Sequence, residues 1–136
     1  MIIEINKNNI KELDNTFVNK EELLNEFDNN PFAKVLVLKK ENNVIGYLYY
    51  SDIYDRLEIN QFEINKDYRN QGNGKYLLQY LIKKENKDIT LEVKKDNYSA
   101  IKVYENAGFI CKAVRKGYYN GIDGLLMERK HEDSSR

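Results

Sequence analysis

The chain has 136 residues, enough for one domain, and 22 Lys and Arg balance 22 Asp and Glu to a formal net charge of +0. This balance provides no overall field to attract nucleic acid or an anionic membrane, and we expect neither as a partner. The single cysteine, Cys111, excludes an internal disulfide, and because the chain has only one histidine, His131, it also leaves no Cys and His ligand set for a zinc site.

The chain begins with an alternating strand pattern rather than with a secretory signal. Residues 2–5 have no basic start and no apolar core of signal length, and no later run of about 18 apolar residues is long enough to span a bilayer. We therefore expect a cytoplasmic protein without membrane association.

Hydrophobic periodicity along the chain alternates between strand and helix patterns. We predict strands at 2–5, 35–38, 44–50, 57–64, 89–93, 109–114 and 124–128, and helices at 10–17, 21–27, 73–84 and 98–106. An early meander followed by strand–helix–strand units predicts an α/β fold, with a mixed sheet and helices on both faces. We expect one domain over residues 1–130 and a polar, disordered tail over 131–136.

Residues 68–75, Tyr-Arg-Asn-Gln-Gly-Asn-Gly-Lys, join the strand at 57–64 to the next helix. The first N–H groups of a helix lack intrahelical partners and carry the positive end of its dipole, so they bind phosphate where no side chain blocks the approach. Gly72 and Gly74 leave the approach open, and Arg69 and Lys75 add cations beside it. The glycine spacing fits neither the dinucleotide-binding fingerprint nor the P-loop. The loop is therefore expected to hold a polyanion in another way.

The pattern Arg69-x-x-Gly72-x-Gly74 after a strand resembles the acyl-CoA pyrophosphate loop of the GCN5-related N-acetyltransferases (GNAT). The resemblance is specific over residues 57–127 and is closest to the RimI-like group, the ribosomal-protein-alanine N-acetyltransferases. It implies the GNAT fold, a twisted mixed sheet of about seven strands with helices on both faces. The later segments that carry it are 91–94, 97–101, 103–109 and 115–119.

The resemblance implies acetyl-CoA as the acetyl donor and no metal. A backbone N–H within 62–64 is expected to stabilise the developing oxyanion. Asn97 also suits the N-cap of the helix at 98–106, and both roles can hold together. The expected cofactor-binding residues are Phe62, Glu63, Ile64, Arg69, Asn70, Gln71, Gly72, Asn73, Gly74, Lys75 and Asn97.

Acyl transfer from a thioester to an amine needs two proton transfers. An ammonium must lose a proton before it attacks, and the departing thiolate takes one up. The resemblance assigns these steps to Glu92 as base and Tyr104 as acid. From the residues alone, Glu92 is an outward carboxylate opposite an apolar strand face, and Tyr104 is a core aromatic at a helix stripe. Glu58 and Glu63 remain alternative bases.

The resemblance specifies the acceptor site in less detail than the donor site. Residues 115–121 are expected to form the loop between the last two strands, where Tyr118 and Tyr119 either flank a bound peptide or are exposed aromatics of a turn. Glu58 is expected beside the acceptor amine. We predict an N-acetyltransferase, monomeric or homodimeric, in which a protein or peptide N-terminal α-amine attacks the thioester directly. The alternatives are a small-molecule amine or a lysine side chain as acceptor, and a non-catalytic acetyl-CoA-binding module.

Overall fold

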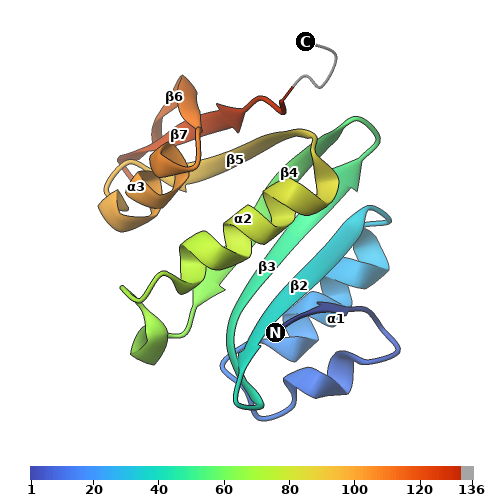
Figure 1. Ribbon diagram of the computed structural model, residues 1–136. Coiled ribbons are helices and arrows are strands. Elements are labelled where there is room, and N and C mark those ends of the chain that lie inside the picture. Colours follow the sequence, from blue (N-terminus) through green and yellow to red (C-terminus); the bar gives the residue numbers. More distant parts are fainter. Residues whose placement is uncertain (133–136) are drawn as a thin grey trace.

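The computed structural model describes residues 1–132 (Figure 1). Within them, no helix is both long enough and apolar enough to cross a bilayer. In chain order the elements are β1 (Ile2–Ile5), the 3-10 helix η1 (Ile10–Leu13), α1 (Lys20–Asn29), β2 (Ala33–Lys40), β3 (Asn43–Ile53), β4 (Arg56–Ile64), the 3-10 helix η2 (Lys66–Tyr68), α2 (Asn73–Glu85), β5 (Asp88–Lys94), α3 (Tyr98–Asn106), β6 (Ile110–Tyr119) and β7 (Ile122–Arg129).

The seven strands in the described part of the chain form one sheet in the order β1-β2-β3-β4-β5-β7-β6. Among the strands of residues 1–132 only β4 and β5 are parallel neighbours, and α2 makes the crossover between them. All the other neighbours are antiparallel. The predicted mixed sheet is therefore confirmed.

Each face of the sheet buries its own apolar cluster. On one face α2 packs Leu77, Leu78 and Leu81 into a cluster that also contains residues of α3 and of the central strands. On the other face α1 contributes Leu23, which joins residues of β1, β2 and β3. Figure 1 shows α2 in front of the sheet and α1 behind it. Helices on both faces, as the hydrophobic pattern predicted, thus enclose a central sheet.

The parallel strands β4 and β5 pair over only part of their length. Their register ends with Ile59 opposite Leu91, and no further pair follows within the described residues. At this point β4 carries one extra residue, Asn60, because Tyr49 and Tyr50 of β3 lie opposite Gln61 and Ile59. A bulge bends a strand and increases its twist, so β4 turns away from β5 beyond Asn60. Figure 1 shows the two strands together at one end and apart at the other.

A chain of polar side chains holds the bulge in place. Ser51 of β3, which is 4% exposed, donates to Asn60 Oδ1 at 2.8 Å and accepts from Asn30 Nδ2 at 2.9 Å. Asn30 ends α1 and also donates to the Tyr49 hydroxyl at 2.8 Å. A buried hydroxyl is stable only with such partners. The position of α1 is therefore tied to the point where β4 bends.

Two predicted elements differ in the structure. The helix expected over 10–17 is only the short η1, because Asp14 is already extended with ψ 135° and Asn15 then adopts a left-handed conformation with φ 59°. The loop expected over 115–121 is mostly strand, since β6 continues to Tyr119. The turn that follows consists of Asn120 and Gly121, both with positive φ, as a tight β-hairpin requires.

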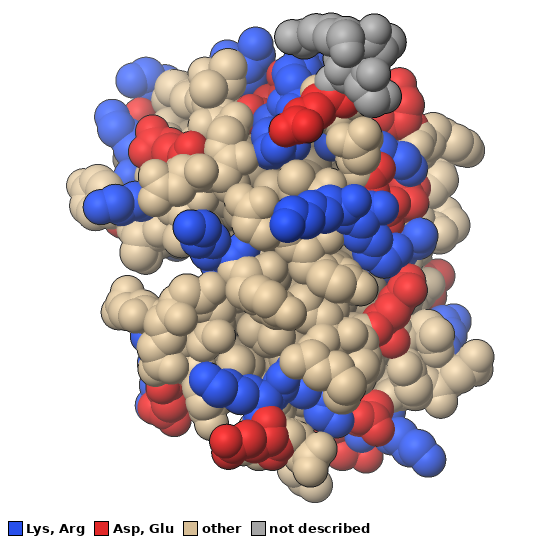
Figure 2. Space-filling view, in the orientation of Figure 1, with Lys and Arg blue, Asp and Glu red and all other residues tan. Residues whose placement is uncertain are grey.

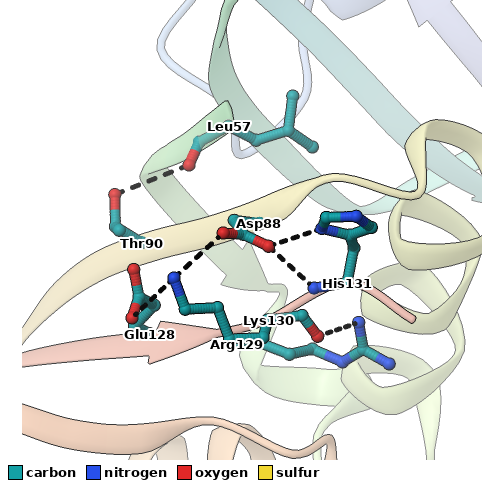
Figure 3. Close-up of polar contacts among 7 residues, drawn as sticks. All are labelled: Leu57, Asp88, Thr90, Glu128, Arg129, Lys130 and His131. Carbon is teal, nitrogen blue, oxygen red and sulfur yellow. Dashed lines mark hydrogen bonds and ion pairs between the residues drawn. The ribbon is translucent and has the colours of Figure 1, made fainter. Parts of the chain in front are cut away.

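The end of the described chain packs against the start of β5 (Figure 3). The His131 N–H donates to Asp88 Oδ1 at 2.9 Å, and His131 Nδ1 lies 2.7 Å from the same oxygen. Lys130 Nζ is 3.2 Å from Asp88 Oδ2 and 3.7 Å from Glu128 Oε1. His131 thus makes defined contacts although we expected the tail to begin there, while 133–136 of that expected tail lie outside the described residues.

Candidate active site

A groove of about 700 Å³ lies where β4 departs from β5. The end of β4, the glycine loop with the start of α2, and α3 form its walls. Figure 2 shows an indentation between the surface over α3 and the surface over the start of α2, bordered by Lys and Arg side chains. The bend at Asn60 therefore opens the groove.

Most of the residues expected to bind the cofactor lie along this groove. Of that set only Gln71 is outside the lining, and its side chain donates instead to the Asp67 carbonyl at 3.3 Å. The lining also contains four residues that the sequence analysis did not single out: Tyr68, Ser99, Ala100 and Val103. Ala100 lies three residues after Asn97 and four before Tyr104, so helical spacing would have placed it on the same side of α3, and Val103 lies three residues beyond Ala100.

The start of α2 presents unpaired N–H groups to the groove. Gly72 is the N-cap with φ 83° and has no side chain to cap the helix, and no acidic residue lies in the first turn. The first intrahelical bond runs from Tyr76 N–H to the Gly72 carbonyl, so the N–H groups of Asn73, Gly74 and Lys75 remain without a helical acceptor. A Cβ at Gly72 would meet nothing within 4 Å, so its positive φ rather than crowding favours glycine. This terminus has the geometry of an anion site.

The two cations of the loop are held differently. Arg69 Nε donates to the Ile64 carbonyl at 2.9 Å, and Arg69 NH2 lies 3.9 Å from Glu63 Oε1. Lys75 forms no ion pair with any residue of 1–132 and lines the groove. A cation at a helix start is unfavourable beside the helix dipole unless an anion lies between them. Lys75 is therefore available to a bound polyanion.

The free edge of β4 faces the groove. Asn65 N–H donates to the Ile45 carbonyl of β3 at 2.8 Å, and alternation in an antiparallel ladder turns the N–H groups of Phe62 and Ile64 the other way. Beyond Ile59 no described residue of β5 pairs with this edge. Buried backbone polar groups need partners, so the edge offers hydrogen-bonding positions to a ligand.

Tyr104 of α3 lies on the groove wall and is 7% exposed. Its ring packs between Phe62 and Phe109, with centroids 6.1 Å and 5.6 Å away. Its hydroxyl makes no hydrogen bond with another residue in the described part of the chain. Burial raises the pKa of Tyr104 to about 12, because the phenolate would lose its hydration. The side chain is thus a neutral proton donor at the groove.

Asn97 has the capping role that its position predicted. Its Oδ1 accepts from the Ala100 N–H at 3.3 Å and from the Ser99 hydroxyl at 3.4 Å. Asn97 also lines the groove, and only its oxygen is used in capping. Its amide nitrogen therefore remains available as a donor at the groove.

Glu92 lies outside the groove lining, on the face of β5 opposite Leu91 and Val93. Arg115 of β6 approaches both carboxylate oxygens, with Nε 3.2 Å from Oε2 and NH1 3.3 Å from Oε1. The Tyr119 hydroxyl donates to Oε1 at 3.2 Å. The guanidinium carbon of Arg115 lies 4.0 Å from the centre of the Tyr118 ring. Glu92, Tyr118 and Tyr119 are thus joined through Arg115 and Glu92, and Arg115 had no role predicted from the sequence.

The two alternative carboxylates occupy other places. Glu58 precedes the bulge, pairs with Thr90 in register, and lies 3.6 Å from Arg56 NH1. Glu63 lines the groove but is exposed and faces Arg69. Neither shares the contacts of Glu92 with Tyr119 and Arg115.

Comparison with known proteins identifies relatives over most of the chain. The profile of the acetyltransferase (GNAT) family matches residues 7–109. A Bacillus subtilis (strain 168) protein, provisionally named a ribosomal protein bS18-alanine N-acetyltransferase, is 31% identical over 114 residues, which cover 79% of this chain and 76% of the relative.

Solved structures share the fold. The crystal structure of a ribosomal-protein-alanine N-acetyltransferase from Escherichia coli superposes with a TM-score of 0.83 at 19% identity, covering 98% of this chain and 95% of that one. A GNAT family acetyltransferase from Elizabethkingia anophelis, crystallised with acetyl-CoA bound, has a TM-score of 0.74 at 16% identity, with 96% and 97% covered. At these identities the likeness concerns the fold.

Proposed function

Because this chain belongs to the acetyltransferase (GNAT) family and is an N-acetyltransferase, we propose that it transfers an acetyl group from acetyl-CoA to the N-terminal α-amine of a protein or peptide. The observation that carries the proposal is the groove in which the open start of α2, the free edge of β4 and Tyr104 meet. The α-amine acceptor is supported by the name of the Bacillus subtilis relative, which gives a ribosomal-protein alanine as its target.

The residues along the groove fit an elongated, phosphate-bearing ligand. The N–H groups at the start of α2 and the Lys75 ammonium suit a pyrophosphate, while the outward N–H and C=O groups of Phe62 and Ile64 suit the amides of a pantetheine arm. Acetyl-CoA supplies a thioester whose carbonyl carbon accepts the amine and whose sulfur leaves. A β4 N–H donates to the carbonyl oxygen as it gains negative charge.

Glu92 and Tyr104 are proposed to manage the protons. Glu92 accepts a proton from the acceptor ammonium, directly or through water, so that the nitrogen lone pair is free to form the N–C bond. As the C–S bond breaks, Tyr104 gives its proton to the sulfur. Burial makes Tyr104 a weaker acid than a phenol in water, so its proton must be replaced by the second proton that the nitrogen releases.

Release of free CoA thiol in the presence of different acceptors tests the proposal. The panel contains peptides that start with Ala, Ser or Met, a lysine-containing peptide with a blocked N-terminus, spermidine and an aminoglycoside. We expect acetyl-CoA-dependent thiol release with free N-terminal peptides and none with the blocked peptide. Release only with the blocked lysine peptide or the small amines would contradict an α-amine acceptor.

A further inference from the structure

The Glu92 carboxylate already accepts three contacts from donors of its own chain. Arg115 contributes Nε to one oxygen and NH1 to the other, and the Tyr119 hydroxyl adds a third donor. The guanidinium carbon of Arg115 also lies 4.0 Å from the centre of the Tyr118 ring. A cation placed between a carboxylate and an aromatic face has the two partners that bind ammonium groups best. Glu92, Tyr118 and Tyr119 therefore form a cation site, and Arg115 fills it.

The contact between Glu92 and Arg115 depends on a glycine in the strand that lies between them. Glu92 is on β5 and Arg115 on β6, and β7 separates these strands in the sheet. Gly124 of β7 lies opposite Arg115 and allows the contact, since a Cβ there would come within 2.9 Å of the Tyr119 ring and 3.5 Å of Glu92 Cδ. Any other residue at this position would push Tyr119 away from the carboxylate.

Arg115 is the more weakly held partner. Its side chain is 51% exposed against 22% for Glu92, and within residues 1–132 Glu92 is its only acidic partner. The register between β6 and β7 is interrupted between Arg115 and Tyr119, and Gly117 in that stretch has φ 61°. An exposed ion pair contributes little free energy, so another cation can replace the guanidinium at the carboxylate. The guanidinium can therefore leave while Glu92 and Tyr119 stay in place.

We propose that Arg115 occupies, in the free protein, the position taken by the acceptor's ammonium group, so that the acceptor binds by displacing Arg115 from Glu92. This inference rests on the proposed function, and it makes Arg115 a determinant of acceptor affinity. The acceptor ammonium takes the place of the Arg115 guanidinium beside the carboxylate, so charge alone contributes little to the binding free energy. Acceptors are then selected by the contacts that their remaining residues make.

The test compares the wild-type protein with Arg115→Gln, which removes the cation but keeps a polar side chain of similar reach. Lys116→Gln is the matched control, because Lys116 is the next residue of β6, is 85% exposed and pairs with Asp123 instead of Glu92. With an Ala-starting peptide, we expect Arg115→Gln to lower KM about threefold to tenfold, with kcat within about twofold of wild type. Lys116→Gln is expected to leave both constants unchanged.

Calorimetry with CoA, which carries no acetyl group, separates binding from turnover. Arg115→Gln should tighten the binding of the free-amine peptide by the same factor and should leave unchanged the binding of the N-acetylated peptide, which has no ammonium. A lower kcat or a higher KM in Arg115→Gln, with normal turnover in wild type, would overturn the inference and leave the proposed function intact. If the wild type acetylates no α-amine peptide, the proposed function fails and the inference fails with it.

Discussion

The hydroxyl of Tyr104 is held at a fixed position on the groove wall. Its ring is clamped between Phe62 and Phe109, so its hydroxyl is held without a protein acceptor in the described part of the chain. Rigid placement matters because a proton donor is effective only within hydrogen-bond reach of the atom that receives the proton. Sequence periodicity indicated the buried ring, whereas the orientation of the hydroxyl depends on packing against one residue of β4 and one residue of the segment between α3 and β6.

Tyr104→Phe removes the hydroxyl and keeps the packed ring. We expect kcat to fall by about 10²-fold to 10⁴-fold, with acetyl-CoA affinity and thermal stability close to wild type. Since burial raises the pKa of Tyr104 to about 12, the wild-type group keeps its proton as pH rises, and we expect no loss of kcat from its ionisation between about pH 7 and pH 10. Steady-state rates across this range would detect either effect. A variant with wild-type kcat would remove Tyr104 from the mechanism.

For Glu92, the sequence pattern predicts the face of the strand but not the contacts of the side chain. The alternation of Ile89, Leu91 and Val93 correctly placed Glu92 on the opposite face of its strand. Its partner Arg115 was not predictable from spacing, because the contact bridges 23 residues and reaches over Gly124 in the strand between them. Strand order sets that contact, and strand order is a property of the whole sheet.

At the scale of elements, the start of α2 and the bend of β4 create the groove together. The glycine spacing identified the loop from sequence, because unpaired N–H groups and missing side chains are local properties. The bulge at Asn60 was not predictable, since it arises from the register with β3 and from the hydrogen bond to Ser51. Likewise, the helix expected over 10–17 is short because Asp14 is extended and Asn15 is left-handed, and periodicity reveals neither conformation.

Gly74→Ala separates ligand binding from folding. A Cβ at Gly74 would lie 3.6 Å from Ile64 Cγ1 and 3.7 Å from Phe62 Cζ, which are ordinary contacts, so the protein itself accommodates a methyl group there. Alanine in the first turn of a helix should preserve the free energy of unfolding or raise it by up to about 1 kcal/mol. The methyl group would nevertheless intrude where the ligand approaches the backbone, and we expect the acetyl-CoA Kd to rise roughly tenfold or more.

Calorimetric titration and a urea melt of the same sample provide both quantities for Gly74→Ala. Weaker binding with unchanged stability would support the groove as the donor site. Unchanged binding would mean that acetyl-CoA does not approach α2 at this residue.

At the scale of the whole molecule, the two faces of the sheet separate the proposed roles. The groove that we propose for the donor lies beside α2 and α3, while Arg115 contacts Glu92 and Tyr118 on the strands β5 and β6, and Tyr119 donates to Glu92. The opening between β4 and β5 is where a thioester on one side can meet an amine from the other. The start of β5 pairs with β4, whereas its end lies apart from β4 and borders the opening.

Asp88 connects the start of β5 with the end of the described chain. Hydrogen bonds from His131 and the nearby Lys130 ammonium lower the pKa of Asp88 to about 2. A lowered pKa stabilises the folded state above the unfolded value near 3.9, and this contribution is lost as pH falls through about 2. We expect Asp88→Asn to lower the free energy of unfolding by about 1 to 2 kcal/mol at pH 7.

Urea melts of wild type and Asp88→Asn at several pH values measure this linkage. The difference between the two proteins should shrink from pH 4 to about pH 2, where the wild-type carboxyl becomes protonated as well. A difference that stays constant over this range would show that the Asp88 charge does not stabilise the junction.

Locating the acetyl group on a peptide that carries both a free N-terminal alanine and an internal lysine tests the central claim most directly. After incubation with the protein and acetyl-CoA, fragmentation in a mass spectrometer assigns the added acetyl group to one of the two nitrogens. We expect acetylation of the α-amine and an unmodified lysine. An acetyl group on the lysine alone, or on neither amine, would contradict the proposed function.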